Sequence, residues 1–339
     1  MANPENLITF LPGLLDSIAL NRPVIIEGME EKKLVAMLPT LIRHKVESIA
    51  LLSMPATAGM NDFYLETYRA QFSAVESKLA KTLKMHNCMF LQGFPRCLEH
   101  ATFFTPGMRT DIDIYVPAAA HRSVCAAAKR VDFDYYGFDS ERIFIITDQQ
   151  ANALTARHWA NKDVALTLLK EVELPASLPI EIQDCYLPYV LRNGKVYLFV
   201  SLEIHHLYTD HSDIAVLEAN REPWREMGVD RCNAEATLYF NLIRLHRGVL
   251  AGEARMRLIL DTACLITNKP HPLDMVRFWQ LVDTSPCKAA IIAVCNALAT
   301  LHTLFEALAQ AYPEHRDSSL SQQWLRQLRH SLQVGSDDE

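Results

Sequence analysis

The sequence predicts an α/β (α+β) fold in which a small mixed sheet flanked by helices is preceded by helices and followed by a helical domain. Residues 1–87 carry apolar side chains at helical spacing, the middle of the chain alternates short apolar strands with a helix, and the chain is helical from about residue 233. Half of the 339 residues are hydrophobic. A chain of this length is expected to form two domains, or one with a large extension.

Each element follows from a local pattern. Apolar residues recur every three to four positions in 31–44 and 62–85, which predicts two helices. Short apolar runs predict strands at 89–93, 112–116 and 142–147, and a helix is expected over 118–130. The dipeptide Asn193-Gly194 favours a tight turn, so a hairpin is expected from 180–190 and 195–207. Further helices are predicted at 233–250, 253–267, 273–281, 286–312 and 318–332.

Composition narrows the class of protein. The net charge of −7 and the pI near 6.0 fit a cytoplasmic enzyme with a small substrate, whereas proteins that grip nucleic acid usually show a basic face. Eight cysteines without a CxxC pair indicate reduced core residues and no disulfide or zinc framework. The N-terminus lacks the features of a signal peptide, and the apolar run 289–301 is too short to span a bilayer, so no membrane is expected.

The chain has no glycine-rich phosphate loop. Glycine is scarce, at 11 residues, and neither GxGxxG nor GxxxxGK[ST] occurs. Any phosphate chemistry must therefore rely on metal ions. In a strand alternate side chains share a face, so Asp111 and Asp113 are expected on one face while Ile112 and Ile114 point into the core. Two carboxylates so close favour a divalent cation such as Mg²⁺.

A second polar pair lies on a later strand. Glu203 and His205 are expected on the face opposite Leu202 and Ile204, among strongly apolar neighbours. An acid in that position needs a partner, which a role as third metal ligand or as a base for an attacking hydroxyl would supply. His205 is either an orienting or ligand residue, or an ordinary strand-end histidine.

These motifs together resemble an uncharacterised bacterial nucleotidyltransferase family of the polymerase-β-like superfamily. The matching residues are Gly93 at a strand end, Arg109 in the approach loop, the pair Asp111 and Asp113, and Glu203 with His205. The helical stretches 234–246 and 258–263 are also similar to the family, and the resemblance covers roughly residues 85–270. It implies a polymerase-β-like nucleotidyltransferase core over 85–215, between an N-terminal helical segment (1–84) and a helical C-terminal domain (216–334), with a disordered tail (335–339).

The resemblance also implies an activity. The expected reaction transfers a nucleoside monophosphate from an NTP to an acceptor and releases pyrophosphate, with Mg²⁺, or alternatively Mn²⁺, held by Asp111, Asp113 and Glu203. Gly93 would let the backbone approach the triphosphate, and Arg96 and Arg109 would stabilise its charge. His205 joins this nucleotide-binding set. A small-molecule acceptor is favoured; a toxin-like transferase acting on protein or RNA, and a catalytically silent nucleotide-binding or scaffold protein, are the alternatives.

The sequence departs from the family pattern in two places and from the pattern of the wider superfamily in a third. Gln92 replaces the lysine before the glycine, which removes a cation able to contact phosphate. Glu203 replaces the usual aspartate but can still ligate magnesium. No serine follows Gly93, where Phe94-Pro95-Arg96 stands instead, so Arg96 is expected to take over the phosphate contact.

Several other residues have two readings. Arg109 is either a loop cation or a triphosphate ligand. The acids and histidines between 203 and 213 lack the spacing of a zinc site. Asp261 is expected to pair with Arg255 or Arg257. The aromatic residues of the middle region are either core or the lining of a base pocket, namely Tyr115, Tyr135, Tyr136 and Phe138.

Overall fold

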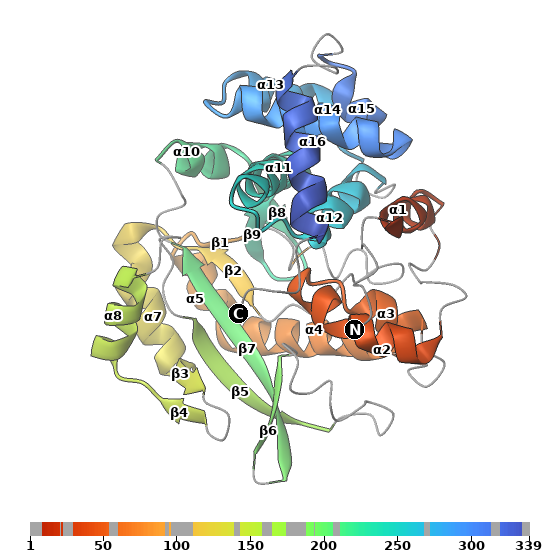
Figure 1. The fold of residues 1–339 in the computed structure, drawn as a ribbon. Coiled ribbons are helices and arrows are strands. Elements are labelled where there is room, and N and C mark those ends of the chain that lie inside the picture. Colours follow the sequence, from red (N-terminus) through yellow and green to blue (C-terminus); the bar gives the residue numbers. More distant parts are fainter. Residues whose placement is uncertain are drawn as a thin grey trace. The chain divides into compact units, whose positions relative to one another are not determined.

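The structure is a computed structural model that describes most of the chain. The described residues are 9–20, 22, 30–53, 60–91, 95, 111–138, 143–157, 165–173, 188–192, 194–205, 211–267, 272–312 and 319–333. They form a mixed α/β fold with a nine-stranded sheet and a helical C-terminal region (Figure 1). The chain divides into two compact units. One contains the first three helices and the chain from Ala234 onward, and the other contains the sheet.

The sheet is mixed. Its strand order is β4-β3-β5-β7-β2-β1-β9-β8, with β6 also paired to β7. The pairs β2–β7 and β1–β9 are parallel and the remaining pairs are antiparallel. The strands are β1 (Met89–Phe90), β2 (Ile112–Tyr115), β3 (Asp134–Phe138), β4 (Ile143–Ile145), β5 (Leu166–Val172), β6 (Tyr189–Arg192), β7 (Lys195–His205), β8 (Arg221–Trp224) and β9 (Val229–Cys232).

Strand β7 organises the sheet because it pairs with β2, β5 and β6. Its even-numbered residues from Leu198 to Ile204 are buried, and the residues between them are partly exposed. His205, which follows Ile204, is also buried. Strand β2 alternates in the same sense, since Ile112 and Ile114 have no exposed surface. The predicted inward face of both strands is therefore confirmed.

The predicted hairpin is present where the structure describes it. Arg192 of β6 pairs with Lys195 of β7, so the two strands join as a tight hairpin at the predicted turn. Gly194 has a φ of +73°, a backbone conformation that L side chains rarely adopt. The Asn-Gly signal thus identified the turn correctly, while the predicted strand residues 180–187 lie outside the described part of the chain.

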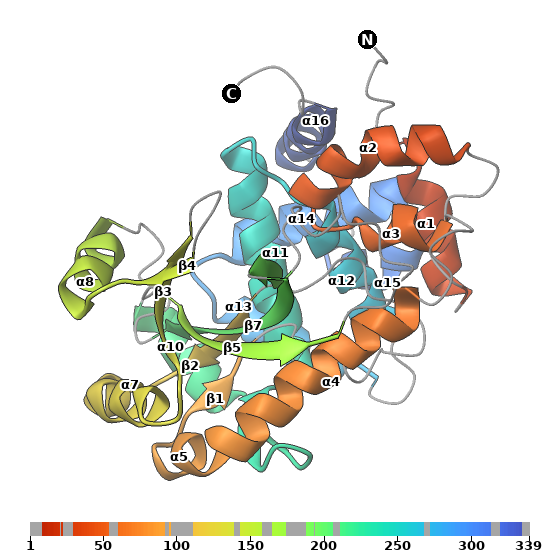
Figure 2. The ribbon, with the colours of Figure 1, turned by 90° about the horizontal axis from the view of Figure 1, so that it is seen from below.

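Helices frame this sheet. They are α4 (Met60–Lys78), α5 (Ala80–Met85), η3 (Ala118–Ala120), α7 (His121–Lys129), α8 (Asp148–Arg157) and α10 (His211–Ala219). Helix α4 runs along the sheet (Figure 2), and its buried Gln71 donates to the carbonyl of Phe199 on β7. The predicted single helix over 62–85 is interrupted at Leu79, whose φ of −124° is not helical.

The β8–β9 hairpin closes one edge of the sheet. Arg221 donates to Asp230 across the hairpin at 3.1 Å and to the backbone carbonyls of Asn87 and Cys88 just before β1. Trp224 is buried and makes edge-to-face contacts with Phe72 of α4 and Phe90 of β1. These contacts connect the hairpin to β1 and α4 within the sheet unit.

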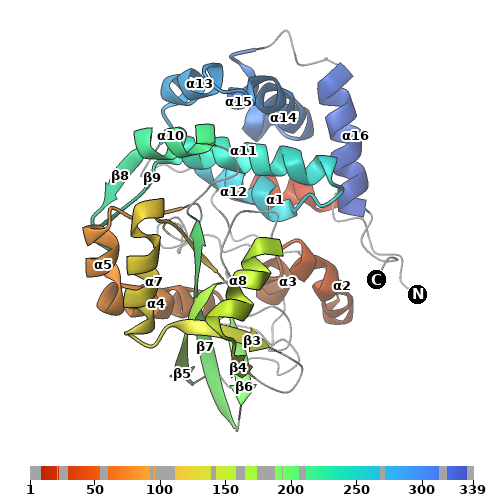
Figure 3. The same cartoon turned by 90° about the vertical axis from the view of Figure 1, so that its left-hand side faces the viewer.

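The other unit is helical. It contains α1 (Leu11–Ala19), α2 (Glu31–Arg43), α3 (Ser48–Ser53), α11 (Ala234–Leu250), α12 (Met256–Thr267), α13 (Met275–Asp283), α14 (Lys288–Leu301), η4 (Thr303–Phe305), α15 (Glu306–Ala309) and α16 (Ser319–Gln333). Helix α11 is buried almost throughout its first three turns, and it packs against α12, α13, α14 and α16 (Figure 3). Four of the predicted C-terminal helices are confirmed with end shifts of a few residues, namely 233–250, 253–267, 273–281 and 318–332.

One predicted helix, 286–312, is wrong in its length. Helix α14 ends at Leu301 because His302 is extended (φ −159°, ψ 139°), and the His302 ring accepts a hydrogen bond from the backbone N–H of Leu304 to begin η4. A side chain that caps the next turn competes with helix continuation. Helix α14 is buried from Ile291 to Ala299. In the described part of the chain, no helix combines the length and apolar character that a membrane crossing requires.

The domain ranges 1–84, 85–215, 216–334 and 335–339 stay predictions. In the structure α4 and α5 belong to the sheet unit, which extends to Asn233. The tail 335–339 lies outside the described residues.

The hairpin turn gives a first testable prediction. Because Gly194 has positive φ and no heavy atom within 4 Å of an added Cβ, Gly194→Val is expected to strain the backbone without causing a clash. The expected loss is about 1–2 kcal/mol of unfolding free energy in urea denaturation. Gly194→Asn is the control and should lose clearly less, since asparagine tolerates this conformation. Equal losses for the two variants would contradict the backbone explanation.

His44, the residue that ends α2, gives a second prediction. Its Nδ1 lies 3.5 Å from the backbone N–H of Met256 and can accept from it only when unprotonated. Burial, followed by the charge of Arg43, lowers the pKa of His44 from 6.5 to about 4. The folded state thus binds this proton less readily than the unfolded state. The stability contribution is complete above about pH 6.5 and is lost as pH falls towards 4, by about 2–3 kcal/mol.

The measurement is the unfolding free energy between pH 4 and 7.5. His44→Gln should flatten this pH dependence. The exposed His330→Gln in α16 should leave it unchanged. A steep dependence that persists in His44→Gln would assign the effect to another group.

Candidate metal centre

Two carboxylates meet where β2 and β7 run side by side. The strands are parallel, and their register makes Asp113 the direct partner of Glu203 and Tyr115 the partner of His205. Directly opposed residues project on the same face of a sheet with their Cβ atoms about 5 Å apart. The buried isoleucines of β2 and the buried Leu202 and Ile204 of β7 occupy the other face.

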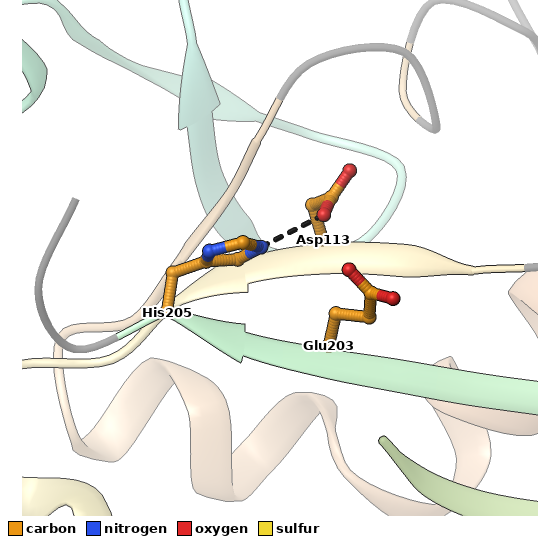
Figure 4. A group of neighbouring side chains, drawn as sticks. All are labelled: Asp113, Glu203 and His205. Carbon is orange, nitrogen blue, oxygen red and sulfur yellow. Dashed lines mark hydrogen bonds and ion pairs between the residues drawn. The ribbon is translucent and has the colours of Figure 1, made fainter. Parts of the chain in front are cut away.

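Asp113, Glu203 and His205 form a compact group, here called the triad. One ligand atom from each residue can be chosen so that all three atoms lie within 4.8 Å of one another. The Nε2 atom of His205 is 2.8 Å from Oδ1 of Asp113. Figure 4 shows the imidazole edge directed at the Asp113 carboxylate, with the Glu203 carboxylate beside it on the neighbouring strand.

The triad is largely shielded from solvent. The side chain of His205 is 9% exposed and that of Asp113 is 15% exposed, and Glu203 is half-buried. Charges at such a depth repel or attract one another more strongly than charges in bulk water. Two carboxylates and an imidazole are a donor set for a divalent metal ion, which would offset the repulsion between the acids.

Asp111 occupies a different position from the other predicted ligands. It is half-buried and lies immediately before β2, two residues before Asp113. The group of atoms within 4.8 Å consists of the triad and excludes Asp111. The structure thus brings together Asp113, Glu203 and His205, and places Asp111 next to them along the chain.

The other predicted site residues lie outside the described part of the chain. They are Gly93, Arg96 and Arg109, together with the substituted residue Gln92. His206 and Asp210 also lie outside it, so the larger acid-and-histidine cluster around β7 is represented by Glu203 and His205.

Tyr115 stands next to the triad and belongs to a network that the sequence did not reveal. It is 5% exposed, and burial and a hydrogen bond to Glu218 raise its pKa. Glu218 accepts from Arg221 at 2.8 Å, the same arginine that binds the chain before β1. Tyr115 therefore has a structural partner on α10. No spacing between Tyr115, Glu218 and Arg221 marks such a network in the sequence.

Other candidate residues have local partners. The Nζ atom of Lys129 lies over the Tyr135 ring, 4.5 Å from the ring centroid. Burial raises the pKa of Tyr136. Asp261 accepts a hydrogen bond from Arg257 at 3.3 Å, which confirms its predicted pairing. Of the six described cysteines, Cys88, Cys232 and Cys295 are buried, as the prediction of core residues requires, and the other three are partly exposed. The side chain of Phe138 lies outside the described part.

One contact was missed by sequence reasoning. The Sγ atom of Cys125 lies 3.6 Å from Nε2 of His121, one turn away on α7. The i, i+4 spacing of the two residues on a predicted helix was the available signal.

Comparison with known proteins gives no relative. No protein family, no curated protein and no solved structure matches this chain. The candidate centre is therefore argued from its own geometry.

The triad predicts a metal-dependent gain in stability. At about 100 times its dissociation constant, Mg²⁺ or Mn²⁺ should add about 2.7 kcal/mol to the stability of the wild-type protein. A rise in melting temperature of several degrees is expected in a thermal-shift assay. The isosteric variants Asp113→Asn and Glu203→Gln should lose this rise, because each removes a charged ligand.

Asp132→Asn is the matched control for this experiment. Asp132 is an exposed acid in the same unit, and its side chain pairs with Lys78 on the surface. The variant should keep the full metal-dependent rise. A rise that survives in both triad variants would place the metal elsewhere.

Proposed function

We propose that the protein is a metal-dependent nucleotidyltransferase that transfers a nucleoside monophosphate from an NTP to an acceptor and releases pyrophosphate. The observation that carries the proposal is the direct pairing of Asp113 with Glu203 across two parallel strands, with His205 against Asp113. Such a group is suited to hold a cation next to phosphate oxygens. The sequence resemblance around Asp111, Asp113 and Glu203 adds the reaction type.

The donor set fits a divalent ion. Carboxylate oxygens are the protein ligands that Mg²⁺ and Mn²⁺ commonly take, and Asp113 and Glu203 lie close enough to share one ion. When bound, the ion would neutralise the triphosphate and lower the pKa of an attacking hydroxyl. The alternative reading of the triad as a structural ion site without nucleotide chemistry is tested by the same experiments.

The residues then have separable roles. Asp113 and Asp111 would hold metal on the side of β2, with His205 in contact with Asp113 at 2.8 Å. Glu203 would hold metal on the side of β7 and take the proton of the attacking group. In this proposal Gly93, Arg96 and Arg109 approach the triphosphate, Gly93 through its backbone and the two arginines through their charge.

A small-molecule acceptor is the preferred choice. The net charge of −7 would repel a nucleic-acid acceptor at long range, so the whole-chain charge favours a small or neutral acceptor. A protein acceptor is the competing possibility, and labelling distinguishes the two.

The test is pyrophosphate release with ATP, CTP, GTP and UTP, each with Mg²⁺ or Mn²⁺. One nucleotide is expected to support turnover in the wild type. Asp113→Asn should lower turnover by at least about 10²-fold, the scale of removing one preorganised charged group. Glu203→Asp should retain more activity than Glu203→Gln, because it keeps a carboxylate.

Label from the α-phosphate then identifies the acceptor. Product that survives both protease and RNase indicates a small molecule, whereas loss after one treatment indicates a protein or an RNA. Absence of metal-dependent binding for every nucleotide would reject the transferase and leave a binding or scaffold protein.

A further inference from the structure

The triad contains a nitrogen donor, which sets it apart from a site built of oxygen alone. His205 is buried, and its ring presents Nε2 to the two carboxylates (Figure 4). The Tyr115 side chain, its direct neighbour on β2, is engaged by Glu218. Because Nε2 lies against the Asp113 carboxylate, it is the ring atom that can share an ion with the two acids.

The distances suit three ligands of one ion. Two ligand atoms that each lie about 2.1 Å from an octahedral ion are about 3 Å apart when adjacent and about 4.2 Å apart when opposite. The observed separation of 2.8 Å between His205 Nε2 and Asp113 Oδ1 matches the adjacent case. All three ligand atoms lie within 4.8 Å of one another, an upper limit that includes both the adjacent and the opposite separations.

We propose that His205 is a metal ligand through Nε2, and that the Asp113–Glu203–His205 centre selects a first-row transition ion, with Mn²⁺ as its representative, over Mg²⁺. Mg²⁺ prefers oxygen ligands, whereas imidazole raises the affinity of transition ions. Mn²⁺ accepts both carboxylates and imidazole and remains six-coordinate. Three protein ligands leave three positions open.

The proposal deepens the proposed function by naming the metal, and it rests on that function only for what fills the open positions. In the transferase these positions take phosphate oxygens and the attacking group. Metal selection itself depends on the triad alone, so it can be measured without nucleotide or turnover.

The competing role of His205 is positioning. In that case Nε2–H donates to Asp113 and the ion contacts the carboxylates only. The substitution His205→Gln separates the two roles, because the amide of glutamine can replace the N–H donor but offers no imidazole nitrogen to the ion. A positioning histidine would be rescued by glutamine, and a ligand histidine would not.

The experiment is Mn²⁺ binding to the full-length protein, stripped of metal by a chelator and free of nucleotide. Electron paramagnetic resonance follows the loss of the free Mn²⁺ signal, and Mg²⁺ competition gives the ratio of the two affinities. The wild type should bind Mn²⁺ at least about tenfold more tightly than Mg²⁺. Electron spin echo modulation should show one directly coupled ¹⁴N nucleus.

In His205→Gln the ¹⁴N coupling should disappear and the Mn²⁺ affinity should fall about 10- to 100-fold, while the Mg²⁺ affinity changes little. His86→Gln is the matched control, since His86 is a partly exposed turn residue of the same unit. It should keep both affinities and the coupling. Melting temperatures of the metal-free proteins show whether each variant is folded.

Absence of ¹⁴N coupling in the wild type, or unchanged Mn²⁺ affinity in His205→Gln, would overturn the proposal and assign His205 to positioning. These results leave the transferase intact if pyrophosphate release persists with Mg²⁺. Conversely, Mn²⁺ bound through nitrogen in a protein that binds no nucleotide would support the metal proposal and reject the transferase.

Discussion

The parallel pairing of β2 with β7 is the interaction on which the candidate centre depends. It aligns Asp113 with Glu203 and at the same time places Ile112, Ile114, Leu202 and Ile204 on the buried face. A shift by one residue would exchange the two faces. Burying each aliphatic side chain contributes about 1.5–3 kcal/mol. Two carboxylates with ligand atoms within 4.8 Å of each other repel by about 3–6 kcal/mol at an effective dielectric constant near 20. The hydrophobic face therefore outweighs the repulsion and fixes the site.

Much of the fold could be predicted from local patterns. Residue spacing is enough to predict an element when the element is long, and a turn dipeptide such as Asn-Gly is enough to predict a hairpin. The alternation of apolar and polar residues predicted the buried faces of β2 and β7, and the Asn-Gly dipeptide predicted the hairpin. Apolar residues at helical spacing predicted most of the C-terminal helices. Strand β5 was missed because its sequence Leu166–Val172 lacks strict alternation, and its pairing with β7 is long-range. The end of α14 was missed because it depends on the backbone of one residue, His302.

The site was predictable only in part. The motifs identified Asp113, Glu203 and His205, because each is a polar residue that alternates with apolar residues along its strand. Asp111 has the same signal as Asp113, and alternation alone cannot tell the two apart, whereas the strand register can. The contact between Asp113 and His205 joins residues 92 positions apart, so it depends on the strand order. The Tyr115–Glu218–Arg221 network has no local signal, because it joins three separate elements.

The β6–β7 hairpin offers a practical position for attaching a probe. Gly194 is exposed at the turn, and Glu203 lies nine positions further along the chain, in the same continuous strand. At about 3.3 Å per residue this distance is about 30 Å. A fluorophore or affinity tag inserted at the turn would therefore stand well clear of the triad. It would also report on the ordering of β7, the strand that carries two of the three triad residues.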